Sequence, residues 1–207
     1  MKKEFLPYQT VRNNAIKLAH TIYSSGFIPD VIYVSLRGGA YLGNVISEYF
    51  KLVKKDDRPV YYAAVVARSY TNISEQENIK VDGWTYNPEH LRQGDRVLLV
   101  DDIFDTGRTM NHLVGIILAK GIPRRDIKVA VHDYKVRKYA AEQLPVHPDY
   151  FSRLHLLNSP EDDFWIHYSS HELMGLTGEE RQEHYYAHDP GLMPALEFLY
   201  GADYEKK

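Results

Sequence analysis

The chain has 207 residues, 44% of them hydrophobic and 26% charged, so it can bury one core and falls in the ordinary range of globular proteins. Its net charge is -3, with 25 basic and 28 acidic residues spread along the chain, which argues against nucleic acid as the main partner. No apolar stretch approaches the roughly 20 residues that span a bilayer, and no signal-like run follows the N-terminus, so we expect a soluble, cytoplasmic protein without a membrane partner. The absence of cysteine excludes disulfides, thiolate nucleophiles and cysteine-based zinc sites.

Helices and strands alternate through most of the chain. Apolar residues at helical spacing predict a helix over residues 8–24, which Gly26 ends. Short β-rich or apolar runs predict strands over residues 30–36, 59–67, 96–100 and 127–134, and helical patterns follow the first and third of these at residues 42–50 and 110–119. This order predicts an α/β fold with a mostly parallel sheet flanked by helices, and a ligand crevice beyond the carboxyl ends of the strands.

Two segments depart from this alternation. Residues 70–93 are polar, with only Ile79 and Val81 suited to a short ribbon, and we interpret this long loop as a mobile lid. From about residue 145 onward, proline, histidine, tyrosine and short mixed segments predict a small hood, followed by C-terminal helices near residues 179–188 and 192–200. We therefore expect a core over residues 1–144, and a hood with C-terminal helices over residues 145–207.

The sharpest candidate site is the segment over residues 97–109, VLLVDDIFDTGRT. Asp101 and Asp102 follow an apolar strand, and Asp105 opens a turn that leads into a helix N-terminus. Such an N-terminus presents unpaired N–H groups and partial positive charge, Gly107 lets an anion approach the backbone, and two threonines add hydroxyl donors, so the turn suits a phosphate monoester. The adjacent aspartates could face ribose hydroxyls or Mg²⁺. A phosphate at one end of the site and hydroxyls or a metal ion at the other describe a sugar phosphate. A plain strand end with a capping Asp is the weaker alternative, because three acids, one glycine and two threonines fall within nine positions.

The segment is very similar to the motif that binds phosphoribosyl diphosphate (PRPP) in type I phosphoribosyltransferases. The resemblance implies that family's fold, a parallel sheet flanked by helices under a variable hood. It implies that Asp101 and Asp102 address the ribose hydroxyls, in part through Mg²⁺. It also implies that Asp105 contacts PRPP and, as in the 6-oxopurine branch, is the acid/base partner of purine N7. The loop implied to hold the 5-phosphate consists of Thr106, Gly107, Arg108 and Thr109.

Two shorter motifs fit the same resemblance. The turn Arg37-Gly38-Gly39 offers backbone N–H groups and a positive charge to an anion, although such a turn can also be a plain strand-to-helix connection. It resembles the diphosphate-binding loop of the family. Ser69-Tyr70 can be an ordinary strand end, yet it resembles the pair that begins the flexible catalytic loop of purine members, where lid closure excludes water.

The remaining candidates concern the base. Lys135 directly follows a predicted strand and resembles the lysine that contacts the exocyclic oxygen of a 6-oxopurine. Trp165 and Ile166 resemble the segment in which an aromatic ring stacks on the purine and the next residue's main chain reads its edge. A solvated lysine and a core tryptophan are the alternatives. Glu172 lies where relatives place a further acidic contact to Mg²⁺ or diphosphate, but the preceding residues depart from the family pattern.

Together these features predict a Mg²⁺-dependent enzyme of purine salvage, with no organic cofactor. It would join PRPP to hypoxanthine, guanine or xanthine and release the nucleoside monophosphate and diphosphate. Two alternatives stay open: a phosphoribosyltransferase for adenine, orotate or uracil, and a PRPP-sensing regulator of the same fold. Only about thirty residues precede the first predicted strand, which is too short for a winged helix. Because relatives are commonly dimers or tetramers, we expect a homo-oligomer.

Overall fold

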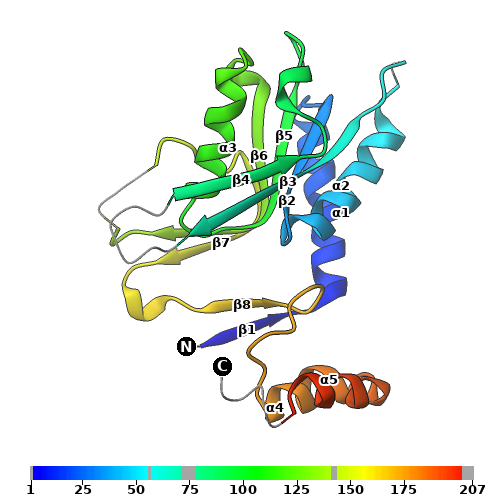
Figure 1. Cartoon of the computed structure of the whole chain (residues 1–207), viewed down its shortest axis with the longest axis vertical. Helices are drawn as coiled ribbons and strands as arrows, with labels where there is room; N and C mark the ends of the chain where they lie inside the picture. Colours follow the sequence, from blue (N-terminus) through cyan, green and yellow to red (C-terminus); the bar gives the residue numbers. More distant parts are fainter. Residues whose placement is uncertain (1, 56, 71–77, 141–143, 202–207) are drawn as a thin grey trace.

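Six strands form the main sheet in the order β4-β3-β2-β5-β6-β7 (Figure 1). The computed structural model describes residues 2–55, 57–70, 78–140 and 144–201. The strands are β2 (Val31–Leu36), β3 (Tyr61–Tyr70), β4 (Asn78–Trp84), β5 (Val97–Phe104), β6 (Ile127–Arg137) and β7 (Tyr150–Leu157). Every neighbouring pair is parallel except β3 and β4. The predicted α/β class and its four strands are confirmed.

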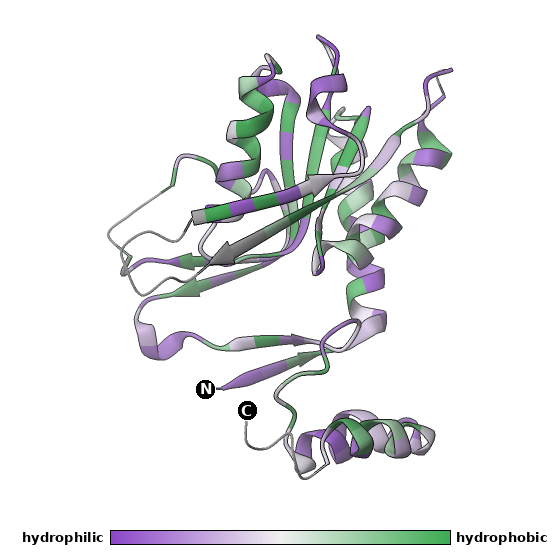
Figure 2. Ribbon diagram, in the orientation of Figure 1, coloured by the Kyte–Doolittle hydropathy of each residue, from purple (hydrophilic) through white to green (hydrophobic). Residues whose placement is uncertain are grey.

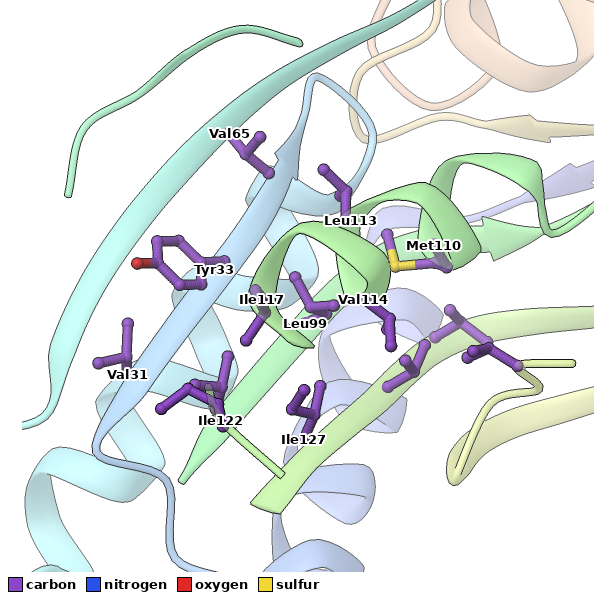
Figure 3. Close-up of a cluster of buried hydrophobic side chains, with 14 of the residues drawn as sticks. Val31, Tyr33, Val65, Leu99, Met110, Leu113, Val114, Ile117, Ile122 and Ile127 are labelled. Atoms are coloured by element: carbon purple, nitrogen blue, oxygen red, sulfur yellow. The ribbon is translucent and has the colours of Figure 1, made fainter. Parts of the chain in front are cut away.

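Helices cover both faces of this sheet. The helices α1 (Tyr8–Ser24) and α2 (Gly39–Val53) pack on one face, and α3 (Arg108–Ala119) packs on the other (Figure 1). Along β5, Val97 and Leu99 belong to the cluster under α3, part of which is drawn in Figure 3, whereas Leu98 and Val100 belong to the cluster under α1 and α2. All four are fully buried, which explains why this strand is a continuous apolar run. In Figure 2 the central strands accordingly show long stretches of the hydrophobic colour, which also marks much of α3.

A second, two-stranded parallel sheet forms the hood from both ends of the chain. It pairs β1 (Lys3–Leu6) with β8 (Trp165–Tyr168), and Leu6, Val11 and Ile166 share its small core. The strand β1 is only four residues long, too short for a periodic pattern to predict. The predicted C-terminal helices are present as α4 (Gly178–Arg181), which continues into a π-helix (Gln182–Tyr186), and α5 (Met193–Leu199). They pack against Phe5 of β1.

Two expected boundaries differ from the structure. The core was expected to end at residue 144, but β7 lies at the edge of the main sheet, while β1 belongs to the hood. The expected lid over residues 70–93 contains β4 and a 3₁₀ turn (Pro88–His90), so part of it has regular structure. Residues 71–77 lie outside the described part, and lid motion stays a prediction. None of the described helices is both long and apolar enough to cross a membrane.

Candidate active site

Three parallel strands bring the sequence motifs to one edge of the sheet. The Arg37 turn follows β2, the segment after Phe104 follows β5, and Lys135 and Arg137 end β6. The strand β5 continues past Val100 through both aspartates, and its pairing with β6 extends to the end of the strand. The sequence predicts a strand end at Val100 because polar residues begin there, whereas backbone pairing with β6 continues.

The Arg37-Gly38-Gly39 turn lies directly against the paired aspartates. A Cβ atom on Gly38 would overlap the carboxylate of Asp102, and a Cβ on Gly39 would lie 2.6 Å from the carbonyl oxygen of Val100 and 2.9 Å from the Cα of Asp101. A side chain at position 39 would therefore require displacement of the β5 backbone, and one at position 38 would require the Asp102 side chain to move. The turn ends at the first residue of α2, which adds a helix N-terminus to this side of the site.

The two aspartates differ in their surroundings. The side chain of Asp102 is 16% exposed, and its Oδ2 lies 3.5 Å from Nε2 of His171. Burial, followed by the charge of Asp102, raises the pKa of Asp101 well above its usual range. Asp101 also accepts a hydrogen bond from the backbone N–H of Asp102. Two carboxylates held this close repel each other, and a cation or a hydroxyl donor would relieve that repulsion.

The predicted phosphate turn has the expected backbone. Gly107 has φ +78°, in the left-handed region, and a Cβ on it would overlap the ring of Phe104. It caps α3, which begins at Arg108, so the turn presents the N-terminus of a 12-residue helix. Thr106 and Arg108 are exposed, whereas Thr109 is half-buried.

Asp105 belongs to a cluster of two cations and two anions. Its Oδ1 accepts a hydrogen bond from Nη2 of Arg137 at 2.6 Å and lies 3.7 Å from Nζ of Lys135. Lys135 is 7% exposed and donates to Oδ1 of Asp163 at 2.7 Å and to the carbonyl oxygen of Phe164 at 2.5 Å. Burial opposes ionisation of Asp163, but the hydrogen bonds from Lys135 and Arg137 outweigh it and lower its pKa to about 2.

The predicted base-stacking residue lies on the hood. The side chain of Trp165 is 51% exposed, and its Nε1 donates to Oε2 of Glu172 at 3.0 Å. Burial raises the pKa of Glu172. The side chain of Ile166 is buried in the hood core, so only its main chain can reach a ligand.

Nine of the predicted site residues line two cavities. One, of about 510 Å³, holds Asp105, Thr106, Arg108 and Lys135 in its wall, together with Arg137. The other, of about 800 Å³, is lined by Arg37, Gly38, Asp102, Trp165, His171 and Glu172, among others. The structure therefore brings the phosphate turn to Lys135, and the diphosphate turn to Trp165 and Glu172. Lys135 and Trp165 do not line the same cavity, although Lys135 bonds to Phe164, the neighbour of Trp165.

A family model for the phosphoribosyl transferase domain matches residues 2–160. The chain belongs to the phosphoribosyl transferase family. The matched range includes both anion turns and Lys135, but it ends before Trp165, Ile166 and Glu172. No curated protein matches the sequence.

Solved structures with the same fold as this phosphoribosyl transferase include three from microorganisms. Purine phosphoribosyltransferase from Pyrococcus horikoshii Ot3 is 21% identical, with a TM-score of 0.63 over 86% of this chain and 99% of that chain. A hypothetical protein from Neisseria gonorrhoeae with bound ppGpp is 20% identical, with a TM-score of 0.62 over 90% and 97%. Xanthine-guanine-hypoxanthine phosphoribosyltransferase from Helicobacter pylori is 18% identical, with a TM-score of 0.51 over 80% and 90%. At these identities the likeness shows the fold alone.

Two charged residues of this phosphoribosyl transferase site, Arg137 and Asp163, escape prediction from the sequence. Arg137 lies two positions after Lys135 on the same strand, so the period of two puts both side chains on one face. A prediction that β6 continues past Tyr134 would have found Arg137. Asp163 gives no comparable signal, because it lies outside regular structure and becomes important only through its contacts with β6.

A buried polar cluster beneath the site also escapes prediction. Asp133 is fully buried and accepts hydrogen bonds from His132, His155 and Tyr168 at 2.6, 2.6 and 2.7 Å. The hydroxyl of Tyr168 also lies 3.2 Å from the carbonyl oxygen of Asp102. The cluster therefore connects the hood strand β8 with the strands that carry the site.

Proposed function

We propose that this phosphoribosyl transferase moves the 5-phosphoribosyl group of PRPP to a 6-oxopurine base and releases diphosphate. The observation that carries the proposal is the direct packing of Gly38 and Gly39 against Asp101 and Asp102. That packing joins an anion-binding turn to a pair of carboxylates on β5, and the phosphate turn begins just after the end of that strand. Anion sites on both sides of a carboxylate pair suit a ribose that carries a phosphate at one end and diphosphate at the other.

The proposed binding of PRPP uses the turns in their observed places. The N-terminus of α3, with Thr106, Arg108 and Thr109, would hold the 5-phosphate. Asp101 and Asp102 would accept hydrogen bonds from the ribose hydroxyls. Arg37 and the N–H groups of its turn would bind the diphosphate, which fits the position of Arg37 in the wall of the larger cavity.

The site also fits the Mg²⁺ ion that the resemblance implies. Among the described residues, no group of three histidine or acidic side chains could cage a metal by itself. Mg²⁺ does not require such a cage, because it usually keeps several waters and binds one or two carboxylates plus substrate phosphates. Asp101 and Asp102 would hold it; burial and the charge of Asp102 raise the pKa of Asp101, and a bound cation would favour its ionised form. Bound Mg²⁺ would neutralise charge on the diphosphate.

The proposed contact for the 6-oxo group is Lys135. An ammonium group has three hydrogens and no lone pair to accept with, and two of the three are donated to Asp163 and Phe164. The third remains for a ligand oxygen. A 6-amino group would bring donors toward a donor, so adenine would be disfavoured at this position. Asp105 lies 3.7 Å from Lys135, where it could accept the hydrogen of purine N7.

In the proposed reaction, purine N9 attacks the anomeric carbon while the bond from that carbon to the diphosphate oxygen breaks. Positive charge develops on the ribose ring, as in other glycosyl transfers. Asp105 would take the N7 proton, and Arg37 would stabilise the charge of the leaving diphosphate. Trp165 would stack on the base, with the main chain of Ile166 at the base edge. Because Trp165 lines the other cavity, this contact requires the hood to shift when substrates bind.

The structural neighbours support a purine rather than a pyrimidine base. Two of them are named as purine or xanthine-guanine-hypoxanthine phosphoribosyltransferases, and the third contains ppGpp, itself a purine nucleotide. These names concern those proteins, and the choice of base in this chain rests on Lys135.

A turnover assay tests the proposal. The protein is incubated with PRPP, Mg²⁺ and each of hypoxanthine, guanine, xanthine, adenine, uracil and orotate, and nucleotide and diphosphate are measured together. We expect equal amounts of both products with at least one 6-oxopurine. Turnover of only adenine or a pyrimidine would overturn the choice of base. Salt-sensitive nucleic-acid binding that PRPP modulates, without any turnover, would favour the regulator instead.

A further inference from the structure

We propose that Arg137 is a positioning residue that fixes the carboxylate of Asp105 and ties the phosphate turn to the segment that enters the hood strand β8. This inference rests on the proposed function, because it assigns Arg137 a part in the same reaction. Arg137 is the last residue of β6, and its side chain is 18% exposed.

The guanidinium group of Arg137 contacts Asp105 at two different atoms. Its Nη1 donates to the main-chain carbonyl oxygen of Asp105 at 2.7 Å, and its Nη2 donates to Oδ1 of the same residue at 2.6 Å. The first bond holds the backbone at the start of the phosphate turn, and the second fixes the side chain. A planar guanidinium can make both bonds at once, whereas the single ammonium of a lysine cannot match this forked geometry.

The same guanidinium reaches the hood. Its Nη2 also donates to Oδ2 of Asp163 at 2.7 Å, and its Nε lies 3.3 Å from that oxygen. The other carboxylate oxygen of Asp163 accepts a hydrogen bond from Lys135, and Asp163 lies two residues before Trp165. Arg137 therefore connects the turn proposed to hold the 5-phosphate with the segment proposed to contact the base. Burial opposes the charge of Arg137, but hydrogen bonds to Asp163 and Asp105 outweigh it and raise its pKa, so Arg137 itself stays protonated.

In this arrangement the two carboxylate oxygens of Asp105 have different roles. Oδ1 is taken by Arg137, and within the described residues Oδ2 has no hydrogen-bond partner. Oδ2 is then the oxygen that meets purine N7. Without Arg137 the carboxylate could rotate about its χ angles, or move from its 3.7 Å contact with Lys135 into a hydrogen bond with it, which would remove the acceptor and occupy the donor meant for the 6-oxo group. A displacement of about 1 Å at a reacting group can reduce a rate by about 100-fold.

The test is a double-mutant cycle on transfer activity with Arg137→Met, Asp105→Asn and both together. We expect Arg137→Met to lower kcat by about 10–100-fold, with a smaller rise in KM for PRPP because the backbone of the phosphate turn also loses a hydrogen bond, and Arg137→Lys to restore less than a tenth of the loss in kcat. If Arg137 acts through Asp105, the double variant should be no slower than Asp105→Asn alone. Multiplied losses in the double variant, or full rescue by Arg137→Lys, would overturn the proposal. Arg125→Met, at a side chain 84% exposed, is the matched control and should leave activity unchanged.

A second cycle separates failure of this proposal from failure of the proposed function. Thermal unfolding of the same variants without substrates measures whether Arg137 and Asp105 are coupled, and it needs no activity. A non-additive loss of stability supports the connection, whereas additive losses overturn it. A wild-type protein that makes no nucleotide would contradict the proposed function, and the unfolding cycle would still decide for or against the connection.

Discussion

Replacement of Asp133 by asparagine tests the polar cluster that joins the hood to the sheet. Asp133 accepts hydrogen bonds from His132 and Tyr168 at Oδ2 and from His155 at Oδ1, and Nε of Arg153 lies 3.3 Å from Oδ1. The amide of Asn14 donates to Nε2 of His132, so the ring hydrogen is on Nδ1 and points at Asp133. Asparagine keeps only one acceptor oxygen.

The cost of this change follows from the geometry. If the remaining oxygen faces His132 and Tyr168, the new NH₂ group meets the N–H of His155, and the attraction to Arg153 is lost. A hydrogen bond to a charged group contributes about 1.5–3 kcal/mol, and the hydrogen bonds that remain in the variant have a neutral acceptor instead of a carboxylate. Loss of one partner of a buried pair typically costs about 3–5 kcal/mol, and a tautomer change at His155 would lower this figure. We therefore expect Asp133→Asn to reduce the free energy of unfolding by about 2–5 kcal/mol.

Thermal and urea unfolding measure this change. For a chain of this size each kcal/mol shifts Tm by about 2–4 °C, so Tm should fall by roughly 4–20 °C. Glu48→Gln is the control, because Glu48 and its partner Lys51 are 63% and 73% exposed, and it should change stability by less than about 0.5 kcal/mol. Although burial favours the neutral acid, hydrogen bonds from His132 and His155 lower the pKa of Asp133, so its contribution is present above about pH 4 and is lost as the solution becomes more acidic. An Asp133→Asn protein within 1 kcal/mol of wild type at pH 7 would refute this reasoning.

Two further predictions concern the substrates. Asp101→Asn should be at least as stable as wild type without ligand, because burial and Asp102 raise the pKa of Asp101 and its ionised form destabilises the fold. In the wild-type protein, stability that is present below about pH 4 is lost as pH rises through the raised pKa. The stability advantage of the variant should therefore grow with pH. The same variant should gain much less Tm from Mg²⁺ and PRPP than wild type does, and a strongly destabilised Asp101→Asn protein would instead indicate a structural role. Trp165→Ala should lose about 1–3 kcal/mol of binding to every purine alike, by analogy with base stacking on aromatic side chains, and an unchanged KM for all purines would show that Trp165 does not stack on the base.

The central strands β2, β5 and β6 could be predicted because they are covered on both faces. Val97 to Val100 are all buried, so β5 is a continuous apolar run, and the glycines at positions 38, 39 and 107 mark places where a side chain would collide with a neighbour. Local chemistry and local structure agree at these positions. That agreement is also why the motif residues were found from the sequence and lie at one edge of the sheet in the structure.

The remaining features depend on contacts between distant parts of the chain. The strand β1 has only four residues and forms through its pairing with β8, more than 150 residues away. Asp163 is one acid among several in its segment, and its contacts with Lys135 and Arg137 arise only when the hood reaches β6. The sequence around Asp133 predicts only a strand, and its hydrogen-bond partners His155 and Tyr168 come from the separate strands β7 and β8. No local pattern contains such information.

Steady-state kinetics of Lys135→Met tests the central claim most directly. The wild-type protein should use hypoxanthine with PRPP and Mg²⁺ and strongly prefer it to adenine, since Lys135 donates to an oxygen and cannot accept from an amino group. Loss of that charge-assisted bond, about 1.5–3 kcal/mol, should lower the hypoxanthine-to-adenine ratio of kcat/KM by roughly 10–150-fold while the KM for PRPP changes little. A wild-type protein that uses no 6-oxopurine, or a ratio unchanged in Lys135→Met, would contradict the account.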